Sequence, residues 1–335
     1  MMPPELRCDP VTGQWVGVST DNSFSPQDYP AGNHRPPQKA MCPFCLEKEH
    51  LTPPEVDAVR LQGSAANHPG WQVRVVPNKF PALRIEGQID RRIQGILEMT
   101  RGIGAHEVVI ETPDHEKNLC DLREDELTFV IQKYQSRILD LSKDKRFRYV
   151  VIFKNYGEAA GASVEHPHTQ IIALPMIPQS VSEEIKGAHQ YYLKHKRCVF
   201  CDIIDQENKD RVRKIAENDH FVAFCPFVSK YPFECWVMPK SHTLQFHLMT
   251  EAEQRNLARV MKETLLRLKV CLSDPAYNFY LHCAPANARP TRSFHWHLEI
   301  IPKLTPGSGF EWGTGFYVVT TEPSVAAGYL RQVHI

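Results

Sequence analysis

The stretch Glu165-His166-Pro167-His168-Thr169-Gln170 runs directly into Ile171-Ile172-Ala173-Leu174, and together they are predicted to form a β-strand. Successive side chains of a strand point to opposite faces, so His166, His168 and Gln170 are expected to share one face. Two imidazoles and a carboxamide in a row can bind a metal, attack a phosphorus centre and donate a hydrogen bond to its oxygens. Histidines packed in a core or lying on a wet surface give the same pattern, so the motif alone leaves function open.

The composition narrows the class of protein. The chain has 335 residues, enough for two modest domains or one large one, with 39 acidic and 39 basic residues. No basic stripe suggests a nucleic-acid partner, and no apolar run approaches the roughly 20 residues that a membrane span needs. The N-terminus, MMPPELRCDP, lacks the apolar core of a signal peptide. We therefore expect a cytoplasmic protein with reduced thiols.

The motifs of the first half recur in the same order in the second half. Each half shows a C-x-x-C pair, a strand that ends near a histidine, a helix, a second strand and an H-x-H motif. In the first half these are Cys42 to Cys45, 105–112 with His115, a helix with Asp121 and Glu124 at capping-box spacing, 149–153, and His166 to His168. In the second half they are Cys198 to Cys201, 234–238 with His242, a helix capped by Thr250 and Glu253, 277–281, and His295 to His297.

This repetition predicts an internal duplication. We expect an N-terminal catalytic domain over residues 1–180 and a C-terminal domain over 181–335, with the seam in a polar, helical stretch over 180–196. Each of the two central helices carries one apolar stripe at helical spacing. The stripes are Leu127, Val130, Ile131, Tyr134 and Ile138 in the first helix, and Leu257, Val260, Met261, Leu265 and Leu268 in the second.

Each half also offers two cysteines and two histidines, the donor set of tetrahedral zinc. The first predicted set is Cys42, Cys45, His115 and His166, and the second is Cys198, Cys201, His242 and His295. The alternative for each C-x-x-C is a redox pair, but Cys42 follows a proline-rich loop rather than a βαβ pattern. Four protein ligands leave no open position, so these sites would be structural. Zinc is expected at both, with iron as an alternative at the second, and His168 is left free for catalysis.

At this point the residues resemble a known family. The matching stretches are Leu6 to Val16, Cys42 to Cys45, Val76 to Leu83, His106 to His115, Phe153 to Asn155, Glu165 to Gln170, Tyr231 to Glu234, Pro239 to His242 and Gly309 to Tyr317. They are similar to galactose-1-phosphate uridylyltransferases of the histidine-triad superfamily and to their relatives, the ADP-glucose phosphorylases. The resemblance covers nearly the whole chain.

The resemblance implies an α+β fold of two tandem histidine-triad-like domains, each a mainly antiparallel sheet with packed helices, in a homodimer. It also implies a ping-pong reaction in which His168 attacks the α-phosphorus of a nucleotide sugar, His166 binds metal and Gln170 hydrogen-bonds the nucleotidylated intermediate. A backbone carbonyl should hold Nδ1 of His168, so that Nε2 faces phosphorus. Positions that match nucleotide or phosphate contacts in the family are Asn78, Phe80, Phe153, Asn155, Gly161 and Ser163.

The sequence departs from the uridylyltransferases in two respects that concern the acceptor. These enzymes carry an R-A-x-R-P segment after the early Trp-Val strand, and here Asn22 and Ser25 replace both arginines. A bidentate phosphate clamp is missing from that place. The block from Gly309 to Tyr317 also differs from the usual sugar-phosphate loop. Four other arginines could substitute for the pair, although each could also be a solvated surface charge: Arg35, Arg91, Arg92 and Arg101.

Three functions follow as expectations. The first is a transferase that moves a nucleoside monophosphate from a nucleotide sugar to a hexose 1-phosphate, of the UDP-glucose:hexose-1-phosphate uridylyltransferase type. The second is a nucleotide-sugar phosphorylase that uses inorganic phosphate as acceptor. The third is a nucleotide-binding relative without turnover, against which the intact His168 and Gln170 argue. In the C-terminal half Glu299 stands where Gln170 stands in the first, and His297 is expected to be a packed or surface residue rather than a second nucleophile.

Overall fold

The computed structural model describes residues 4–30, 32, 42–285, 288 and 291–335 of the chain. The α-helices in this part are α1 (Glu124–Leu141), α2 (Gln179–His195), α3 (Val199–Asp210), α4 (Glu251–Cys271), α5 (Gly309–Thr314) and α6 (Pro323–Gln332). The strands of the first half are β1 (Glu5–Cys8), β2 (Trp15–Val18), β3 (Asp57–Arg60), β4 (Trp71–Pro77), β5 (Arg92–Gln94), β6 (Leu97–Met99), β7 (Ala105–Ile110), β8 (Tyr149–Tyr156) and β9 (His168–Leu174). Those of the second half are β10 (Lys214–Glu217), β11 (Phe221–Phe224), β12 (Cys235–Pro239), β13 (Tyr277–His282), β14 (His297–Pro302) and β15 (Tyr317–Val319).

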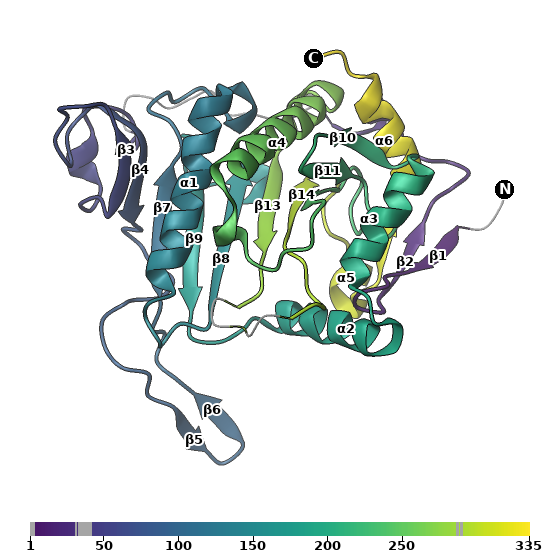
Figure 1. Ribbon diagram of the computed structural model, residues 1–335, viewed down its shortest axis with the longest axis horizontal. Coiled ribbons are helices and arrows are strands. Elements are labelled where there is room, and N and C mark those ends of the chain that lie inside the picture. Colours follow the sequence, from purple (N-terminus) through teal and green to yellow (C-terminus); the bar gives the residue numbers. More distant parts are fainter. Residues whose placement is uncertain (1–3, 31, 33–41, 286–287, 289–290) are drawn as a thin grey trace.

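A 10-stranded antiparallel sheet runs through the centre of the molecule in the order β10-β11-β12-β14-β13-β8-β9-β7-β4-β3 (Figure 1). Read outward from the middle, the first half contributes β8, β9, β7, β4 and β3, and the second contributes β13, β14, β12, β11 and β10. The two series have the same order on either side of the centre. This mirrored order is the arrangement that an internal duplication predicts.

The β8–β13 pair joins the halves, and its register relates equivalent positions. Phe153 of β8 lies opposite Tyr280 of β13. On the outer sides, Phe153 lies opposite Gln170 and Tyr280 lies opposite Glu299. Gln170 and Glu299 are therefore equivalent, as the sequence predicted, and a pseudo-two-fold axis passes between Phe153 and Tyr280.

Helices α1 and α4 lie side by side over one face of this sheet (Figure 1). Both apolar stripes predicted from the sequence are buried between the helices and the sheet. The capping box of Thr250 and Glu253 is present at the start of α4. The predicted box of Asp121 and Glu124 is wrong, because Asp121 instead closes a 3-10 turn that begins at Asn118, and α1 starts after Arg123 with Glu126 as its box partner.

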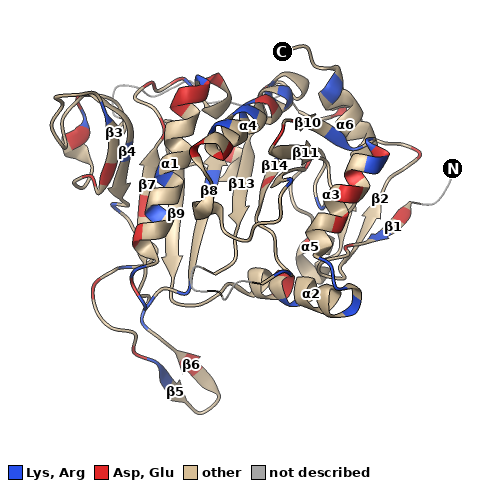
Figure 2. Cartoon of the chain, viewed as in Figure 1, with Lys and Arg blue, Asp and Glu red and all other residues tan. Residues whose placement is uncertain are grey.

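Two smaller features complete the molecule. The sheet β1-β2-β15 pairs the first strands of the chain with a strand near its end, so the N-terminal segment lies against the C-terminal half. The β5–β6 hairpin extends away from the body and carries both acidic and basic residues (Figure 2). None of the helices in the described part combines the length and apolar character that crossing a membrane requires.

The predicted α+β class with mainly antiparallel sheets is confirmed. The predicted helical seam is α2. The boundary between residues 180 and 181 stays a prediction, since one sheet is continuous across the two halves.

Candidate functional site

His168, the first residue of β9, lies on the face of the sheet opposite the helices. Thr169 bonds the hydroxyl of Tyr134 from α1 at 2.7 Å, so it faces the helical layer, and the alternation of the strand turns His168 and Gln170 to the other side. The strand begins at His168, and His166 precedes it. The strand therefore starts later than predicted, and His166 lies just before it, in the cluster with Cys42, Cys45 and His115.

One hydrogen bond fixes the His168 ring. Its Nδ1 lies 2.8 Å from the carbonyl oxygen of His166, and as the donor it leaves the lone pair on Nε2. The prediction of a backbone carbonyl in this role is confirmed. Burial lowers the pKa of His168 to about 4, so the imidazole is neutral near pH 7. A neutral ring with a free Nε2 is the form that acts as a nucleophile.

Gln170 is oriented by His106, a residue whose role the sequence did not reveal. The backbone N–H of Ala82 donates to Nδ1 of His106 at 3.1 Å, so Nε2 carries the proton and donates it to Oε1 of Gln170 at 2.8 Å. The Asn78 amide nitrogen lies 3.1 Å from the same Nε2. With its oxygen engaged, Gln170 has its amide N–H groups left to donate, which is what a developing phosphoryl oxygen requires.

A tight loop after β8 brings Asn155 and Gly161 together. Asn155 accepts a bond from Asn278 at 2.8 Å, and its Nδ2 lies 3.4 Å from the carbonyl of Gly161. Gly161 has φ +85, a conformation that favours glycine. The N–H groups of residues 160 to 162 all donate to carbonyl oxygens within the loop, so these three are not available to a bound phosphate.

The remaining predicted contact residues lie on the same side of the molecule as Gln170 or in adjoining loops. Phe153 is the cross-strand neighbour of Gln170. Phe80 follows Asn78, whose Oδ1 accepts its N–H at 2.9 Å, and its ring is 83% exposed. Ser163 is exposed at the end of the loop. The exposed ring of Phe80 leaves an apolar face for a planar group.

The first predicted metal set forms one cluster. The ligand atoms of Cys42, Cys45, His115 and His166 all lie within 4.8 Å of one another. Sγ of Cys45 is 3.3 Å from Nδ1 of His115 and 3.6 Å from Nδ1 of His166, and the two Nδ1 atoms are 3.3 Å apart. His166 gives its Nε2 proton to the carbonyl of Thr112 at 2.8 Å, which leaves the lone pair on Nδ1 facing the cluster.

The second set repeats this geometry. Cys198, Cys201, His242 and His295 also lie within 4.8 Å of one another, and Sγ of Cys201 is 3.3 Å and 3.6 Å from the two Nδ1 atoms. Zinc bonds of about 2.0 to 2.3 Å at tetrahedral angles place two nitrogens about 3.3 Å apart, and a nitrogen and a sulfur about 3.6 Å apart. Both clusters match these separations, so their donors fit zinc.

A third group, which the sequence did not predict, lies at the pseudo-symmetric counterpart of His168 and Gln170. Glu184 of α2, His282 and His297 bring their ligand atoms within 4.8 Å of one another. His297 is 1% exposed and stacks between Trp236 and His282, which confirms that it is a packed residue. Although burial opposes the charged form, Glu299 and Glu184 raise the pKa of His282 well above its usual value.

The arginines near the β5–β6 hairpin are exposed and paired with carboxylates. Ser25 donates both its N–H and its hydroxyl to Asp28, each at 2.7 Å. The three arginines pair with nearby carboxylates and are 60 to 68% exposed, as surface charges are: Arg91 with Glu98, and Arg92 and Arg101 with Asp90. Arg35 lies outside the described residues.

Comparison with known proteins agrees with this arrangement. The family described as galactose-1-phosphate uridyl transferase, N-terminal domain, matches residues 2–178, and a domain of unknown function, DUF4921, matches residues 114–331. ADP-glucose phosphorylase from Arabidopsis thaliana is 34% identical over 99% of this chain and 93% of that protein. The chain belongs to the galactose-1-phosphate uridylyltransferase family. It is an enzyme of the nucleotidyltransferase class.

Other members of the family match over the same length. Galactose-1-phosphate uridylyltransferase from Thermotoga maritima is 28% identical over 99% of both chains. The crystal structure of the Arabidopsis thaliana ADP-glucose phosphorylase with bound ADP-glucose has a TM-score of 0.82 at 32% identity, covering 99% of this chain and 100% of that one. A uridylyltransferase structure has a TM-score of 0.76 at 27% identity, covering 97% of each chain.

Proposed function

We propose that this family member transfers a nucleoside monophosphate from a nucleotide sugar through a covalent intermediate on His168. Nε2 of His168 attacks the α-phosphorus, an N–P bond forms, and the bond from phosphorus to the bridging oxygen breaks, which releases a sugar 1-phosphate. An oxygen of an acceptor phosphate then attacks the same phosphorus, and the N–P bond breaks. The ring returns to its neutral form, and its Nδ1–H still donates to the carbonyl of His166.

The observation that carries this proposal is the fixed orientation of His168 beside an oriented Gln170. The bond to His166 O keeps Nε2 available, and the chain from Ala82 through His106 turns the Gln170 amide outward as a donor. In this role Gln170 stabilises the negative charge that develops on the phosphoryl oxygens. Six residues around it would bind the nucleotide and its phosphates: Asn78, Phe80, Phe153, Asn155, Gly161 and Ser163.

The proposed acceptor of the default reaction is a hexose 1-phosphate, as in UDP-glucose:hexose-1-phosphate uridylyltransferases. A phosphorylase reaction, with inorganic phosphate as acceptor, is the second candidate, and two observations favour it. The segment that carries the arginine pair in uridylyltransferases has Ser25 bonded to Asp28 instead. The match to the ADP-glucose phosphorylase is also higher, at 34% against 28% identity.

Structural zinc at both Cys2His2 clusters is part of the proposal, with iron as the alternative at the second. The donor separations support zinc, and so does the presence of two thiols in each set. Zinc there would hold the loop of Cys42 and Cys45 against the segment of His166 that positions His168.

A cytoplasmic homodimer is the proposed state of the enzyme. The ten cysteines, all without a disulfide, suit a reducing compartment. Phe310 and Trp312 on α5 are 55% and 82% exposed, and apolar rings of this size at the surface support contact with a second copy.

Mass measurement of the intact protein tests the reaction. The enzyme is incubated with UDP-glucose, ADP-glucose or GDP-mannose and no acceptor, and the added mass names the nucleotide. Phosphate and galactose 1-phosphate are then supplied to the labelled protein in separate reactions. Faster loss of label with galactose 1-phosphate supports the uridylyltransferase reaction, faster loss with phosphate supports the phosphorylase, and no label from any donor contradicts the proposal.

A further inference from the structure

A buried ion pair lies directly behind the strand that carries His168, on the helix-facing side of the sheet. Nζ of Lys154 is 2.6 Å from Oε2 of Glu111, and the side chains are 1% and 0% exposed. Lys154 belongs to β8, and Glu111 follows the end of β7. The catalytic steps above use neither residue.

The pair contacts the backbone and side chains of β9 at its first residues. Lys154 donates a second hydrogen bond, of 3.1 Å, to the carbonyl oxygen of His168. Glu111 accepts from the hydroxyl of Thr169, and its backbone N–H donates to the carbonyl of Pro167 at 3.2 Å. Three consecutive residues, 167 to 169, are therefore held from behind by this one pair.

The pseudo-symmetric half shows what the same place contains where no nucleophile is needed. Lys154 and Leu281 are equivalent, because Lys154 directly follows Phe153 and Leu281 directly follows Tyr280, the two residues at the pseudo-two-fold axis. Thr169 and Leu298 are equivalent, since they lie opposite Val109 and Val237. Two residues further along β7 and β12, Glu111 corresponds to Pro239. Lys154, Thr169 and Glu111 thus correspond to three apolar residues behind His297, namely Leu281, Leu298 and Pro239.

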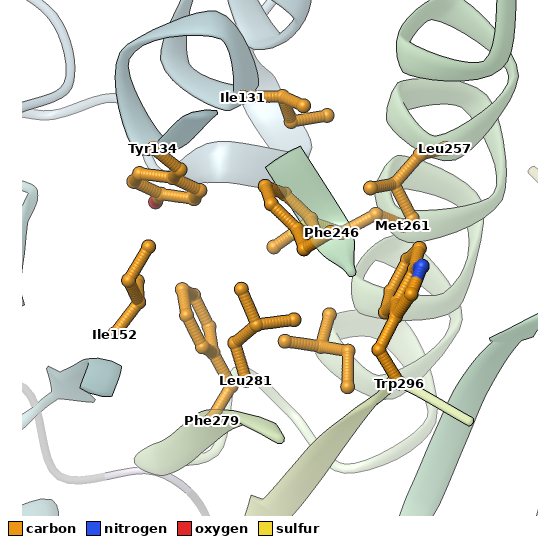
Figure 3. A pocket seen from close by; sticks show the side chains of 10 residues that line it. Ile131, Tyr134, Ile152, Phe246, Leu257, Met261, Phe279, Leu281 and Trp296 are labelled. Atoms are coloured by element: carbon orange, nitrogen blue, oxygen red, sulfur yellow. The ribbon is translucent and has the colours of Figure 1, made fainter. Parts of the chain in front are cut away.

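In the second half, the apolar residues that replace these charges pack between the sheet and the helices. Leu281 and Leu298 line a small apolar cavity of about 10 Å³ together with Tyr134, Met261 and Trp296 (Figure 3). About one water molecule would fill that volume. Behind β13 and β14, the layer between the sheet and the helices is therefore filled by apolar side chains.

Stability does not explain why the first half keeps its charges. Desolvation of a buried ion pair offsets most of the attraction between its partners, and apolar residues of similar volume are often at least as stable. The half with Leu281 and Leu298 is such a replacement within the same molecule. What distinguishes the two halves is the second histidine of each H-x-H motif: Nε2 of His168 is available for attack, whereas the His297 ring is stacked between Trp236 and His282 and its Nε2 lies 3.3 Å from Glu184.

We propose that Lys154, paired with Glu111, is a positioning residue that fixes the backbone of residues 167 to 169 and thereby the place of the His168 ring for attack on phosphorus. This inference rests on the proposed function. Nδ1 of His168 is bonded to the backbone two residues before it, so the ring follows any displacement of this segment. Attack on phosphorus is sensitive to such displacement, and a shift of about 1 Å costs roughly 100-fold in rate.

The test uses the double variant Lys154→Met/Glu111→Gln, which removes both charges and keeps an amide oxygen at position 111 that can accept from Thr169. The matched control is Arg137→Met/Glu107→Gln, which removes an ion pair whose side chains are both 8% exposed and which joins α1 to β7 away from His168. Both variants are checked for melting temperature and metal content. Label formation from the donor found active for the wild type is then followed in a single turnover at rising donor concentrations.

We expect the Lys154 and Glu111 variant to retain metal and to form label about 100-fold more slowly at saturation, with an unchanged half-saturating concentration. The control variant should label at the wild-type rate even if its melting temperature falls. Equal rates for the two variants at saturation would overturn the inference. If the double variant does not fold, Lys154→Gln with wild-type Glu111 takes its place.

A second readout separates this inference from the proposed function. Amide hydrogen exchange of a peptide covering 166–174 reports on the strand whether or not chemistry occurs. The first variant should exchange faster there than the wild type, while a peptide covering 295–302 should be unchanged. Failure of the wild type to take label would contradict the proposed function, and unchanged exchange at 166–174 would contradict the positioning role.

Discussion

Two histidines separated by one proline have different surroundings because their rings are held by different atoms. His166 bonds the carbonyl of Thr112 through Nε2 and turns Nδ1 to the cysteines. His168 bonds the carbonyl of His166 through Nδ1 and keeps Nε2 free. A single choice of ring nitrogen therefore separates the proposed metal ligand from the proposed nucleophile, and two substitutions should separate the two roles.

We expect His168→Gly to abolish transfer and leave the metal content intact, because His168 is outside both clusters. Added imidazole should restore part of the activity by occupying the space that the ring leaves beside Phe44. Metal analysis and a transfer assay with and without imidazole measure these effects. His166→Ala is the control, and it should lose close to one metal ion. Normal turnover of His168→Gly would show that another residue attacks phosphorus.

The sequence predicted the groups that carry chemistry better than the groups that orient them. His168, Gln170 and both Cys2His2 sets are adjacent in sequence or follow repeated spacing, and the structure brings each set together. His106, Lys154 and Glu111 were not predicted, because their partners are distant in sequence. His106 and Gln170 are 64 residues apart on neighbouring strands, and Lys154 and Glu111 are 43 residues apart on either side of β9. The cluster of Glu184, His282 and His297 was not predicted for the same reason, since it joins a helix to two strands.

At the scale of the elements, each predicted metal cluster connects a C-x-x-C segment to the residues that precede an H-x-H strand. Cys42 and Cys45 lie in a short turn with no strand or helix of its own, and Cys198 and Cys201 lie at the start of α3. Burial raises the pKa of the Cys42 thiol to about 11, so without a cation this thiol stays protonated. A metal ion would supply the charge that ionises it and binds the turn to the sheet.

We predict that Cys42→Ser and Cys198→Ser each lower the tightly bound metal by about one ion per chain. A structural zinc contributes several kcal/mol, and a loss of about 3 kcal/mol lowers the melting temperature of a chain of this size by roughly 4 °C. Elemental analysis and thermal unfolding measure the two effects. Cys8→Ser, which changes an exposed cysteine outside both clusters, is the control. Metal-free wild-type protein with an unchanged melting temperature would contradict the structural role.

The predicted start of α4 agrees with the structure, whereas the predicted N-cap of α1 lies two residues too early. Thr250 accepts the N–H of Glu253 as a capping box should. Asp121 has equal capping potential, but Asn118 uses it to close a 3-10 turn, and Lys269 of α4 pairs with it at 2.7 Å. Asn118 and Asp121 thus form a competing capping box three residues earlier, and a second one, Arg123 with Glu126, starts α1.

At the scale of the whole molecule, the two halves share one sheet. β8 and β13 are both central strands, and each would become an unprotected edge if the halves were separated. The N-terminal strands also depend on β15, and Arg7 pairs with Glu322 at 2.8 Å. The duplicated halves are therefore expected to be folding partners rather than independent units.

Expression of 1–180 and 181–335 as separate chains tests this expectation. Each piece alone should be insoluble or lack a cooperative unfolding transition, because it exposes the edge of β8 or of β13. Production of both pieces in one cell should give a soluble complex. A soluble, monomeric 1–180 piece that unfolds cooperatively with one bound metal ion would show that the first half folds alone.

The central claim is that phosphorus is attacked by His168 and by no other group. The enzyme should take up a nucleotide label from its nucleotide sugar without an acceptor, and the label should be acid-labile and base-stable, as a phosphoramidate is. Peptide mapping of the labelled protein by mass spectrometry should place the added mass on His168, and none on His297, whose ring is stacked between Trp236 and His282. A label on His297 or on any other residue would contradict the account.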